Sequence, residues 1–445
     1  MKKTVISALA SVLALGTVLT GCGEKDVKST PTTVEAGKAN PVTIRFLYWA
    51  KPEVYKPAIE AFEKKYPNIK VKYETVVEND SNESMKKMDV LYASGDTFDV
   101  FSLNAVPAFA QRATNGMLEP LDEYLKKEGV KYEDIYKAEQ IKVGGQRYSL
   151  PGKFGPWFVL LNKAQLDAAG LPVPSSWTWD EFREYAKKLT KGEGPSKQYG
   201  TFFHTWKDYM LLKKYSTPVN QNILTDDGSA FDRDNPLLKA SMELRYNMEQ
   251  VDKSAPPYID VVSQKIPYRD QYFQGKAAML PTGPWMITEA GGTDKIPATF
   301  VSAFAPWPTN NKGDEPYSFG GADPLVISSK SQHKQEAYQF IRFLTTEGMT
   351  LTGQLSAWKN ADVAKELEQI INTTKSPDKI DKDSLIHVHK VTKLPNPVVP
   401  PAYSGEVEKA FLSQAEKYLL GETKLDATVD AMKTNISKII ESNKK

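Results

Sequence analysis

The sequence predicts an α/β fold divided into two lobes. Strand-like segments alternate with helix-like segments along the chain, and the C-terminal region is helical in pattern. The chain also has 445 residues, far more than one typical hydrophobic core requires. We therefore expect each lobe to contain a sheet with helices packed against it.

The first residues have the features of a secretory signal peptide. Lys2 and Lys3 precede the uncharged apolar stretch Val5–Leu19, which is too short to span a bilayer and is followed by small residues. The run that ends at Cys22 resembles the lipobox of bacterial lipoproteins, in which the cysteine is acylated and the chain is cut before it. We expect residues 1–21 to be removed and Cys22 to carry the lipid. The alternative is an ordinary signal peptide with an incidental cysteine.

Charge, cysteine content and aromatic content narrow the function. The chain has 57 Lys and Arg against 55 Asp and Glu, a balance that argues against a nucleic-acid-binding or polybasic membrane surface. Cys22 is the only cysteine, so no intramolecular disulfide can form. The 8 Trp, 21 Tyr and 18 Phe suit a protein that binds a ligand with flat apolar faces and polar edges. Residues 22–40 are polar and contain Lys, Ser, Thr, Pro and Gly, which is typical of a flexible tether.

The folded body begins with a strand, a helix and a second strand. Val42–Tyr48 alternates apolar and polar residues as a strand does, and Ile69–Tyr73 does so again. Between them, Pro52–Tyr66 places apolar residues on one helical face, and Pro67 ends that helix. This order predicts a βαβ unit with parallel strands.

Similar segments recur along the rest of the chain. Thr178 and Glu181 have the spacing of a capping box, which predicts the start of a helix. Two strands, Tyr148–Pro151 and Trp157–Leu161, are expected to flank a link rich in Gly and Pro. Further strands are expected at Phe98–Leu103, Thr201–His204, Ala277–Leu280 and Pro324–Ile327, and helices before Ala113, over Ala337–Leu344 and from Glu406 onward.

The sequence gives little support to metal or nucleophile chemistry. His387 and His389 have the spacing for one face of a strand, but no third ligand is near them in sequence. The acidic stretch Asp226–Asp234 lacks the alternating spacing of a calcium loop. Neither a phosphate-binding loop nor a nucleophile elbow is present. We therefore expect no metal ion and no cofactor. A secreted polysaccharide-cleaving enzyme, which needs two carboxylates across a glycosidic bond, stays open as an alternative.

Five groups of residues occur in a characteristic order and spacing. They are Ile44–Tyr73; Phe98–Phe101 with Gly116–Leu121; Tyr148–Pro151 with Leu161–Lys163, Ala169–Leu171 and Trp177–Phe182; Phe273–Met279 with Gly283–Trp285; and Gly320–Ala322 with Ala337–Thr345. Together they resemble the extracellular solute-binding proteins of ABC importers, whose best-known members bind maltose and other oligosaccharides. The resemblance extends from Val42 to the C-terminus.

This resemblance implies the type II periplasmic-binding-protein fold, with the ligand in a cleft between two lobes. The chain would cross between the lobes near Pro151–Pro156, near Pro306–Pro308 and near Thr345–Gly348. The Pro and Gly residues of the first two crossings fit hinge elements with defined backbone angles. The expected boundaries are 41–152 with 306–346 for the first lobe and 153–305 with 347–445 for the second.

Aromatic and polar residues near strand ends are the candidates for ligand contact. A sugar has an apolar ring face, which an aromatic ring can cover, and a rim of hydroxyl groups, which polar side chains can bind. By the resemblance, Trp285 stacks on the sugar. Trp49 and Asn104 follow strands at the end where α/β lobes meet their ligands, and Asp323 follows two glycines that allow close approach. The remaining candidates are Trp206, Tyr209, Tyr403 and Lys153. For each of them the alternative is packing in the core.

The resemblance also implies the function. The protein would be a monomeric, lipid-anchored substrate-binding protein at the outer face of the cell membrane. It would bind a carbohydrate such as an oligosaccharide, close around it and deliver it to the permease subunits of an ABC importer, without catalysis and without a nucleic-acid partner. The alternatives are a peptide, a polyamine or another small solute in the same fold, presentation of the ligand to a membrane sensor kinase, or the glycan-cleaving enzyme.

Overall fold

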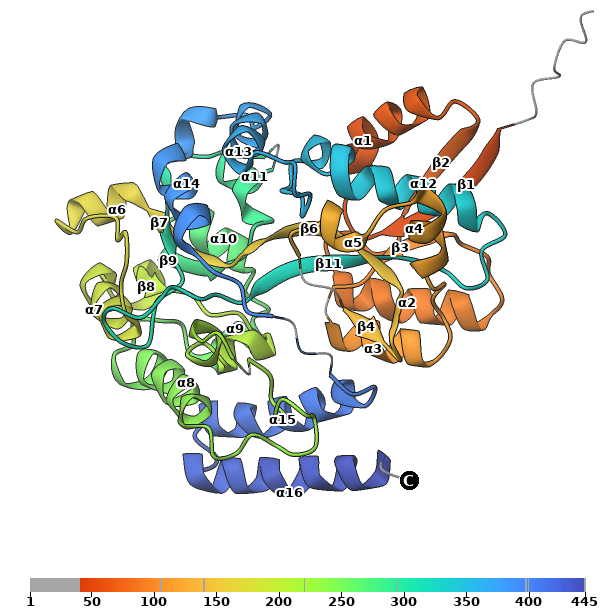
Figure 1. The fold of residues 1–445 in the computed structure, drawn as a ribbon. Helices are drawn as coiled ribbons and strands as arrows, with labels where there is room; N and C mark the ends of the chain where they lie inside the picture. The colour runs from red at the N-terminus through yellow and green to blue at the C-terminus, as the bar shows by residue number, and fades with distance from the viewer. Residues whose placement is uncertain are drawn as a thin grey trace, which may run out of the picture. The chain divides into compact units, whose positions relative to one another are not determined.

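The structure is a computed structural model that describes residues 41–104, 106–138, 141–219, 221–293, 295–396, 398 and 400–443. The expected signal peptide, the lipidation site Cys22 and the tether lie outside these residues. In the part of the chain that is described, none of the helices combines the length and the apolar character that a bilayer crossing requires. The described elements form two main sheets, each surrounded by helices (Figure 1).

The strands of the first sheet are β1 (Val42–Tyr48), β2 (Ile69–Thr75), β3 (Val100–Ser102), β6 (Ser149–Pro156) and β11 (Gly320–Ile327). Their order is β2-β1-β3-β11-β6. Strand β1 is parallel to β2 and β3, whereas β11 is antiparallel to β3 and β6. The predicted βαβ unit at the start of the body is therefore confirmed.

Helices cover both faces of the first sheet. Alternate residues of β1 enter different cores, because successive side chains of a strand point to opposite faces: Phe46 is 0% exposed in one core and Leu47 is 1% exposed in the other. The helices are α1 (Pro52–Lys65), α2 (Ser81–Ala93), α3 (Val106–Thr114), α4 (Asp122–Glu128), α5 (Tyr132–Ile135) and α12 (Lys334–Phe343), with a small hairpin of β4 (Lys142–Val143) and β5 (Gln146–Arg147).

The strands of the second sheet are β7 (Phe158–Asn162), β8 (Tyr199–Thr201), β9 (Ala277–Thr282) and β10 (Ser302–Pro306), in the order β10-β7-β9-β8. Strand β7 is buried on both faces, which explains its continuous apolar sequence. The surrounding helices are α6 (Lys163–Ala168), α7 (Trp179–Leu189), α8 (Pro236–Tyr246), α9 (Tyr258–Ser263), α10 (Tyr268–Phe273), α11 (Met286–Ala290), α13 (Val363–Asn372), α14 (Lys382–Val391), α15 (Ser404–Leu419) and α16 (Leu425–Asn443).

Two predictions about helices are confirmed in this half of the molecule. The backbone N–H of Glu181 donates to Thr178 Oγ1 at 3.2 Å, and Glu181 Oε2 accepts from the backbone N–H of Thr178 at 2.7 Å, so the capping box starts α7 as expected. The C-terminal region is helical, with α15 and α16 packed side by side (Figure 1).

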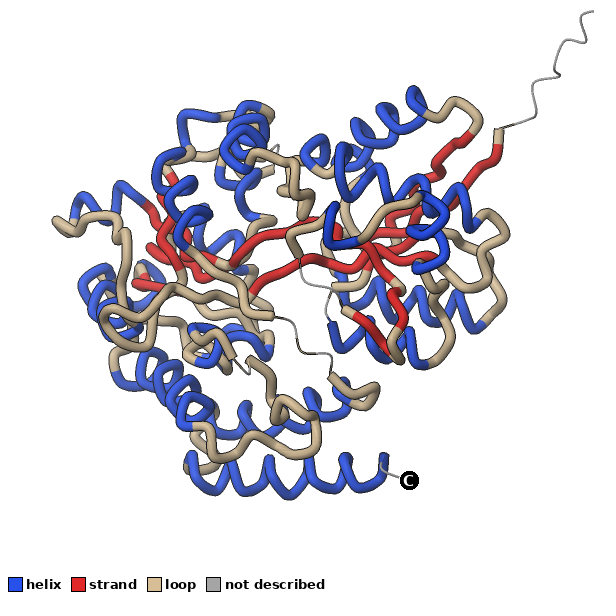
Figure 2. The backbone as a smooth tube through the Cα atoms, viewed as in Figure 1, coloured by secondary structure: helices blue, strands red, loops and turns tan. Residues whose placement is uncertain are grey.

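Strands β6 and β11 run next to each other between the two halves of the molecule (Figure 2). The expected link of Gly and Pro between two strands is wrong, because β6 continues through it to Pro156. Proline and glycine are tolerated there because β6 is the edge strand of its sheet. Gly152 also has a steric role, since a Cβ at this position would lie 2.8 Å from the carbonyl oxygen of Asp323 on β11.

The assignment of His387 and His389 to a strand is also wrong. Both residues lie on helix α14, where positions two apart point to different sides and do not share one face. The ring of His387 pairs through Nε2 with the carbonyl oxygen of Ser175 at 2.8 Å. Among the described residues, no group of His, Cys, Asp and Glu side chains has the arrangement of a metal site.

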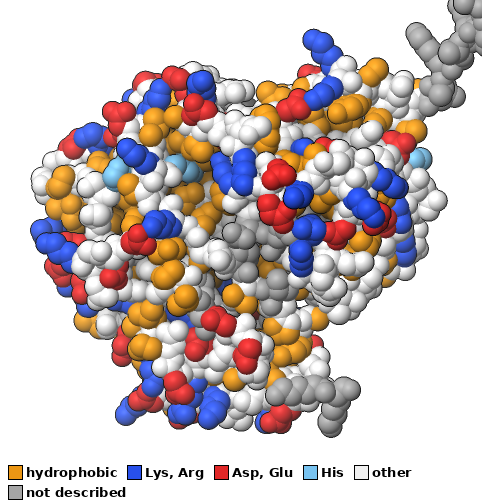
Figure 3. Space-filling view, viewed as in Figure 1, with side chains coloured by type: hydrophobic (Ala, Val, Ile, Leu, Met, Phe, Trp, Pro, Cys, Tyr) orange, Lys and Arg blue, Asp and Glu red, His pale blue; other side chains and the backbone are white. Residues whose placement is uncertain are grey.

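The two sheets form the cores of two lobes. The exact boundaries of the lobes stay a prediction, but Trp307 is 1% exposed in a core of the second lobe. The return of the chain to the first lobe therefore lies after this residue. On the face shown in Figure 3, Lys and Arg side chains are interspersed with Asp and Glu.

Candidate ligand-binding site

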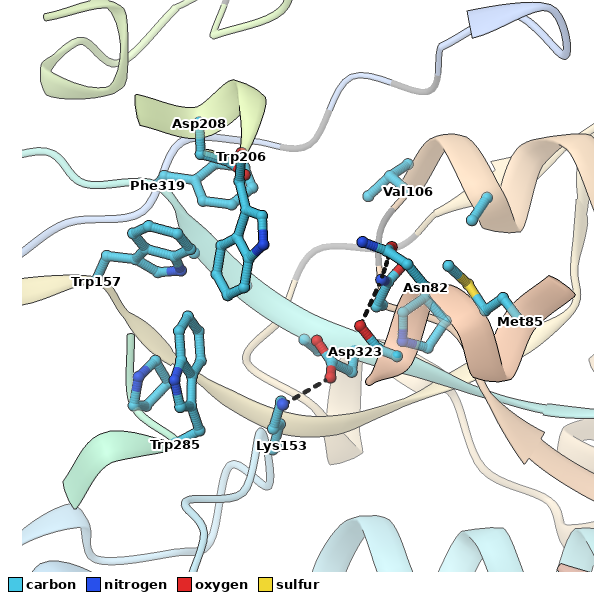
Figure 4. Close-up of a pocket in the computed structure, with 18 of the residues that line it drawn as sticks. Asn82, Met85, Val106, Lys153, Trp157, Trp206, Asp208, Trp285, Phe319 and Asp323 are labelled. Carbon is cyan, nitrogen blue, oxygen red and sulfur yellow. Dashed lines mark hydrogen bonds and ion pairs between the residues drawn. The ribbon is translucent and has the colours of Figure 1, made fainter. Parts of the chain in front are cut away.

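A cavity of about 1970 Å³ is lined by residues of both lobes. Its floor contains residues of the paired strands β6 and β11, which connect the lobes. One wall comes from the second lobe and is aromatic, and the opposite wall comes from α2, α3 and the loop before α3 in the first lobe. Figure 4 shows the open space between these walls.

We call Trp157, Trp206, Trp285, His204, Tyr268 and Phe319 the aromatic wall. The Trp157 ring centroid lies 5.3 Å from that of Trp285 and 6.4 Å from that of Trp206, and Trp206 and Trp285 are 6.0 Å apart. These rings are too close together to admit a ligand between them, so they form a continuous surface. Such a surface offers indole faces and edges to an apolar ring in the cavity.

A hydrogen bond and a close ring contact within the aromatic wall hold its rings in place. Trp285 Nε1 donates to the hydroxyl of Tyr268 at 3.2 Å, and the ring of His204 lies 4.1 Å from that of Trp206. Burial, with the positive charges of Arg245 and Arg269 nearby, lowers the pKa of His204 to about 3. His204 is therefore a neutral imidazole at neutral pH and acts here as an aromatic partner.

The opposite wall carries paired side-chain amides. Asn104 Nδ2 donates to Asn82 Oδ1 and to Ser81 Oγ, each at 2.8 Å. These bonds use the two donors of Asn104 and leave its Oδ1 atom and the Nδ2 group of Asn82 without a partner among the described residues. Rotating both amides by half a turn exchanges the roles but still leaves one carbonyl and one NH₂ group. The pair can therefore both donate to and accept from hydroxyl groups.

Lys153 on β6 and Asp323 on β11 form an ion pair on the floor, with Lys153 Nζ 2.9 Å from Asp323 Oδ2. Asp323 lies at a register shift between Ala322 and Pro324, where it has no partner in the regular ladder. Trp49 follows β1 and stacks on Tyr48, with ring centroids 4.1 Å apart. The ammonium of Lys153 lies within 5.9 Å of the Trp49 ring.

Most of the residues that the sequence analysis selected come together in this cavity. Trp285, Trp49, Asn104, Asp323, Trp206, Tyr403 and Lys153 all line it. Tyr403 precedes α15 and donates its hydroxyl to the carbonyl oxygen of Gly228 at 3.2 Å.

Tyr209 is placed differently. Its side chain is 1% exposed, and its hydroxyl donates to the carbonyl oxygen of Pro281 at 2.8 Å. Its ring lies 5.8 Å from Trp157 and 6.3 Å from Trp206, and Tyr209 is not among the residues that line the cavity. Its visible role is to support the aromatic wall from the core.

Several lining residues were not selected from the sequence. Trp157 was expected only as the first residue of a strand, and Asn82 lies in a polar helix turn that carries no motif. His204 and Phe319 were likewise missed. The side-chain contact between Asn82 and Asn104 joins elements separated in sequence, so no local pattern could have indicated it.

The geometry defines a class of protein: two α/β lobes, joined by paired strands, that enclose a small solute in a cleft with one aromatic and one polar wall. The sequence profile of the bacterial extracellular solute-binding proteins matches residues 49–351, and the chain belongs to this family.

Known proteins agree with this assignment. The multiple sugar-binding protein of Streptococcus mutans is 26% identical over 319 residues, which cover 69% of this chain and 72% of that protein. An ABC substrate-binding protein of Listeria monocytogenes in complex with cycloalternan has a TM-score of 0.75 and 24% identity over 90% of this chain and 99% of its own. A solute-binding protein of Thermotoga lettingae bound with α-D-tagatose has a TM-score of 0.70 and 22% identity over 90% of this chain and 100% of its own.

Proposed function

We propose that this protein is the substrate-binding component of an ABC importer and that its ligand is a neutral oligosaccharide. One observation carries the proposal: the aromatic wall faces paired amides across a cavity of about 1970 Å³. This volume exceeds the roughly 300–1000 Å³ typical of a small-ligand pocket, which favours a ligand of several sugar units. The sugars bound by two of its structural relatives, and the sugar binding named for its Streptococcus relative, support a carbohydrate.

Three cations that line the cavity are already paired with carboxylates, which favours an uncharged ligand at these positions. Lys153 is paired with Asp323, and Arg147 is paired with Asp122 and Glu133. Arg269 and Glu289 pair through two hydrogen bonds, of 2.7 and 2.8 Å. An acidic sugar that bound one of these three cations would have to displace its carboxylate, at a cost in free energy that a neutral hydroxyl group does not incur.

The mechanism is capture by closure. Apolar ring faces of the ligand lie on Trp285 and Trp206, and its hydroxyl groups bind Asn82 and Asn104 of the other lobe. Only a closed form satisfies both sets of contacts, so the ligand favours closure by the difference in its affinity for the two forms. The closed protein then presents the ligand to the permease, and no bond is made or broken in the cleft.

The remaining parts of the proposal concern location. Cys22, acylated on its thiol and made the first residue by removal of residues 1–21, would anchor a monomeric protein to the outer face of the cell membrane. Metabolic labelling with a clickable fatty acid tests this point. The protein should incorporate the label, and Cys22→Ser should abolish it.

A panel of mono- and oligosaccharides tests the ligand class. Tryptophan fluorescence and thermal shift should both respond to neutral oligosaccharides, because binding changes the environment of Trp206 and Trp285. A response to peptides or amines, with none to any sugar, would replace the proposed ligand class. Release of reducing sugar by the purified protein would instead establish a glycan-cleaving enzyme.

A further inference from the structure

The ammonium group of Lys153 lies between two indole rings that belong to different lobes. Its Nζ atom is 5.9 Å from the ring centroid of Trp49 and 5.6 Å from that of Trp285. The same atom pairs with Asp323 Oδ2 at 2.9 Å, as the dashed line in Figure 4 marks. The side chains are 17% exposed for Lys153 and 21% exposed for Asp323, so this pair is largely shielded from water.

The partners of this ammonium group make up a site for a cation. The face of an indole attracts a positive charge within about 6 Å, and two such faces are present here. The carboxylate of Asp323 adds a full negative charge, whose attraction is stronger in a partly dehydrated cavity than in water. An amine or a quaternary ammonium ion requires the same combination of aromatic faces and negative charge.

We propose that Lys153 is a specificity residue, which excludes cationic solutes from the cleft by filling the site that Trp49, Trp285 and Asp323 would otherwise offer them. The inference rests on the proposed function only in taking this cavity as the place of ligand binding. It deepens that function by defining the charge class of the ligand, because the carboxylate of Asp323, beside the two indole rings, is already paired with Lys153.

A tethered ammonium group has an advantage over one in solution. A short flexible tether holds a group at an effective concentration on the order of millimolar, so a free amine must exceed that concentration to displace it. The main chain of Lys153 is fixed by β6 and by a bridge to Ser356, so filling the site orders no additional backbone. A neutral sugar does not compete for this position, since a lysine ammonium has three donors and can bind a hydroxyl group while it stays paired.

Removal of the ammonium group tests the inference. Lys153→Ala is titrated separately with methylammonium chloride and with tetramethylammonium chloride, and binding is followed by tryptophan fluorescence. Sodium chloride at the same ionic strength serves as the reference. We expect saturable binding at least about tenfold tighter than to the wild type, because two indole faces and the carboxylate of Asp323 become available to the cation. Asp323→Asn in the Lys153→Ala background should weaken this binding again.

A matched control is available outside the cavity. The Nζ atom of Lys330 lies 4.1 Å from the ring centroid of Tyr92 and donates to the carbonyl oxygen of Tyr92 at 2.6 Å, and Lys330 does not line the cavity. Lys330→Ala should leave cation binding at the wild-type level. Equal cation binding by this variant and by Lys153→Ala would show that the effect is not specific to the cleft and would overturn the inference.

The inference is also overturned if folded Lys153→Ala binds neither cation saturably, or if the wild type binds them as tightly. Folding is checked by circular dichroism and thermal unfolding. If Lys153→Ala does not fold, Lys153→Met retains the apolar stem and serves for the same titration. The sugar panel is a separate readout. If no sugar binds, the proposed ligand class is wrong, but the cation titration of the lysine variant still decides the present inference.

Discussion

The indole rings of Trp157 and Trp285 meet edge to face, with centroids 5.3 Å apart and planes inclined by 82°. Trp157 directly follows the connecting strand β6, and Trp285 directly precedes helix α11. The contact therefore links the floor of the cleft to the element that carries the main candidate for sugar stacking. Both rings belong to one surface, and substitutions in that surface should affect ligand binding more than folding.

Trp285→Ala should weaken binding of a responsive oligosaccharide by about tenfold or more, because burial of an aromatic face contributes about 1.5 kcal/mol or more. Isothermal titration calorimetry with the best ligand of the panel measures the change. Trp358→Ala is the matched control, since Trp358 is half-buried against the first core and does not line the cavity. Equal affinity of Trp285→Ala and the wild type would remove Trp285 from the site.

Asn82→Ala should reduce affinity by about fivefold, the equivalent of one hydrogen bond of ~1 kcal/mol. It removes both the free amide of Asn82 and the acceptor that orients Asn104. Asn115→Ala, at an exposed position outside the cavity, should have no effect on affinity. If a sugar binds Asn82→Ala and the wild type with the same affinity, it does not contact the paired amides of Asn82 and Asn104.

Stability should decrease with acidification below about pH 6.5, and His204 should contribute to that decrease. Its folded pKa of about 3 lies below the usual value, so the unfolded chain binds the proton more tightly and acid favours unfolding. The loss of stability due to His204 begins as the pH falls to its unfolded pKa of about 6.5 and ends near its folded pKa of about 3. His204→Phe keeps an aromatic ring and removes the titration. Its melting temperature should therefore fall less between pH 7 and pH 5 than that of the wild type, and an identical pH profile would contradict this role.

Glu249→Ala should destabilise the second lobe strongly. Arg245 and Glu249 are both 0% exposed at their side chains and pair at 2.7 Å, and Glu249 also accepts from the backbone N–H of Tyr258. Removing one partner of such a buried pair costs about 3–5 kcal/mol, because the other charge stays buried. Chemical denaturation measures the change.

The exposed pair of Lys56 and Glu60 provides the comparison for this prediction. Lys56 Nζ lies 3.9 Å from Glu60 Oε1, and the two side chains are 70% and 67% exposed. Glu60→Ala should therefore change the free energy of unfolding by less than about 1 kcal/mol. If Glu60→Ala and Glu249→Ala lower the free energy of unfolding by similar amounts, burial does not determine the cost of breaking the ion pair.

Local patterns indicated the segments whose structure depends on nearby residues. Alternation in Val42–Tyr48 and the capping box at Thr178 were predictable, because strand pleating and helix capping act within a few residues. The link at Pro151–Pro156 was not, because edge position in a sheet, which makes proline acceptable, depends on strands far away in sequence. His387 and His389 were assigned the wrong period for the same reason, since a short apolar run fits a strand or a helix until its neighbours are known.

The site was predictable in its parts and not in its arrangement. Trp285 could be chosen from the family resemblance, and Trp49, Asn104 and Asp323 because strand ends and glycine turns mark where side chains can reach a ligand. Trp206 and Tyr209 belong to the same aromatic stretch of the sequence, yet of these two only Trp206 lines the cavity. Which ring of such a stretch faces solvent depends on the packing around it.

By itself, the sequence determined the α/β class, the alternation of strands and helices, the residue types available for binding and the family, because these follow from local periodicity and ordered motifs. Only the tertiary structure decided that Asn82 meets Asn104, that Trp157 completes the aromatic wall, and that Lys153 fills the space between Trp49 and Trp285. The physical reason is that these contacts join elements remote in sequence. Their distances are set by how the sheets and helices of two lobes pack, which no short stretch of the chain encodes.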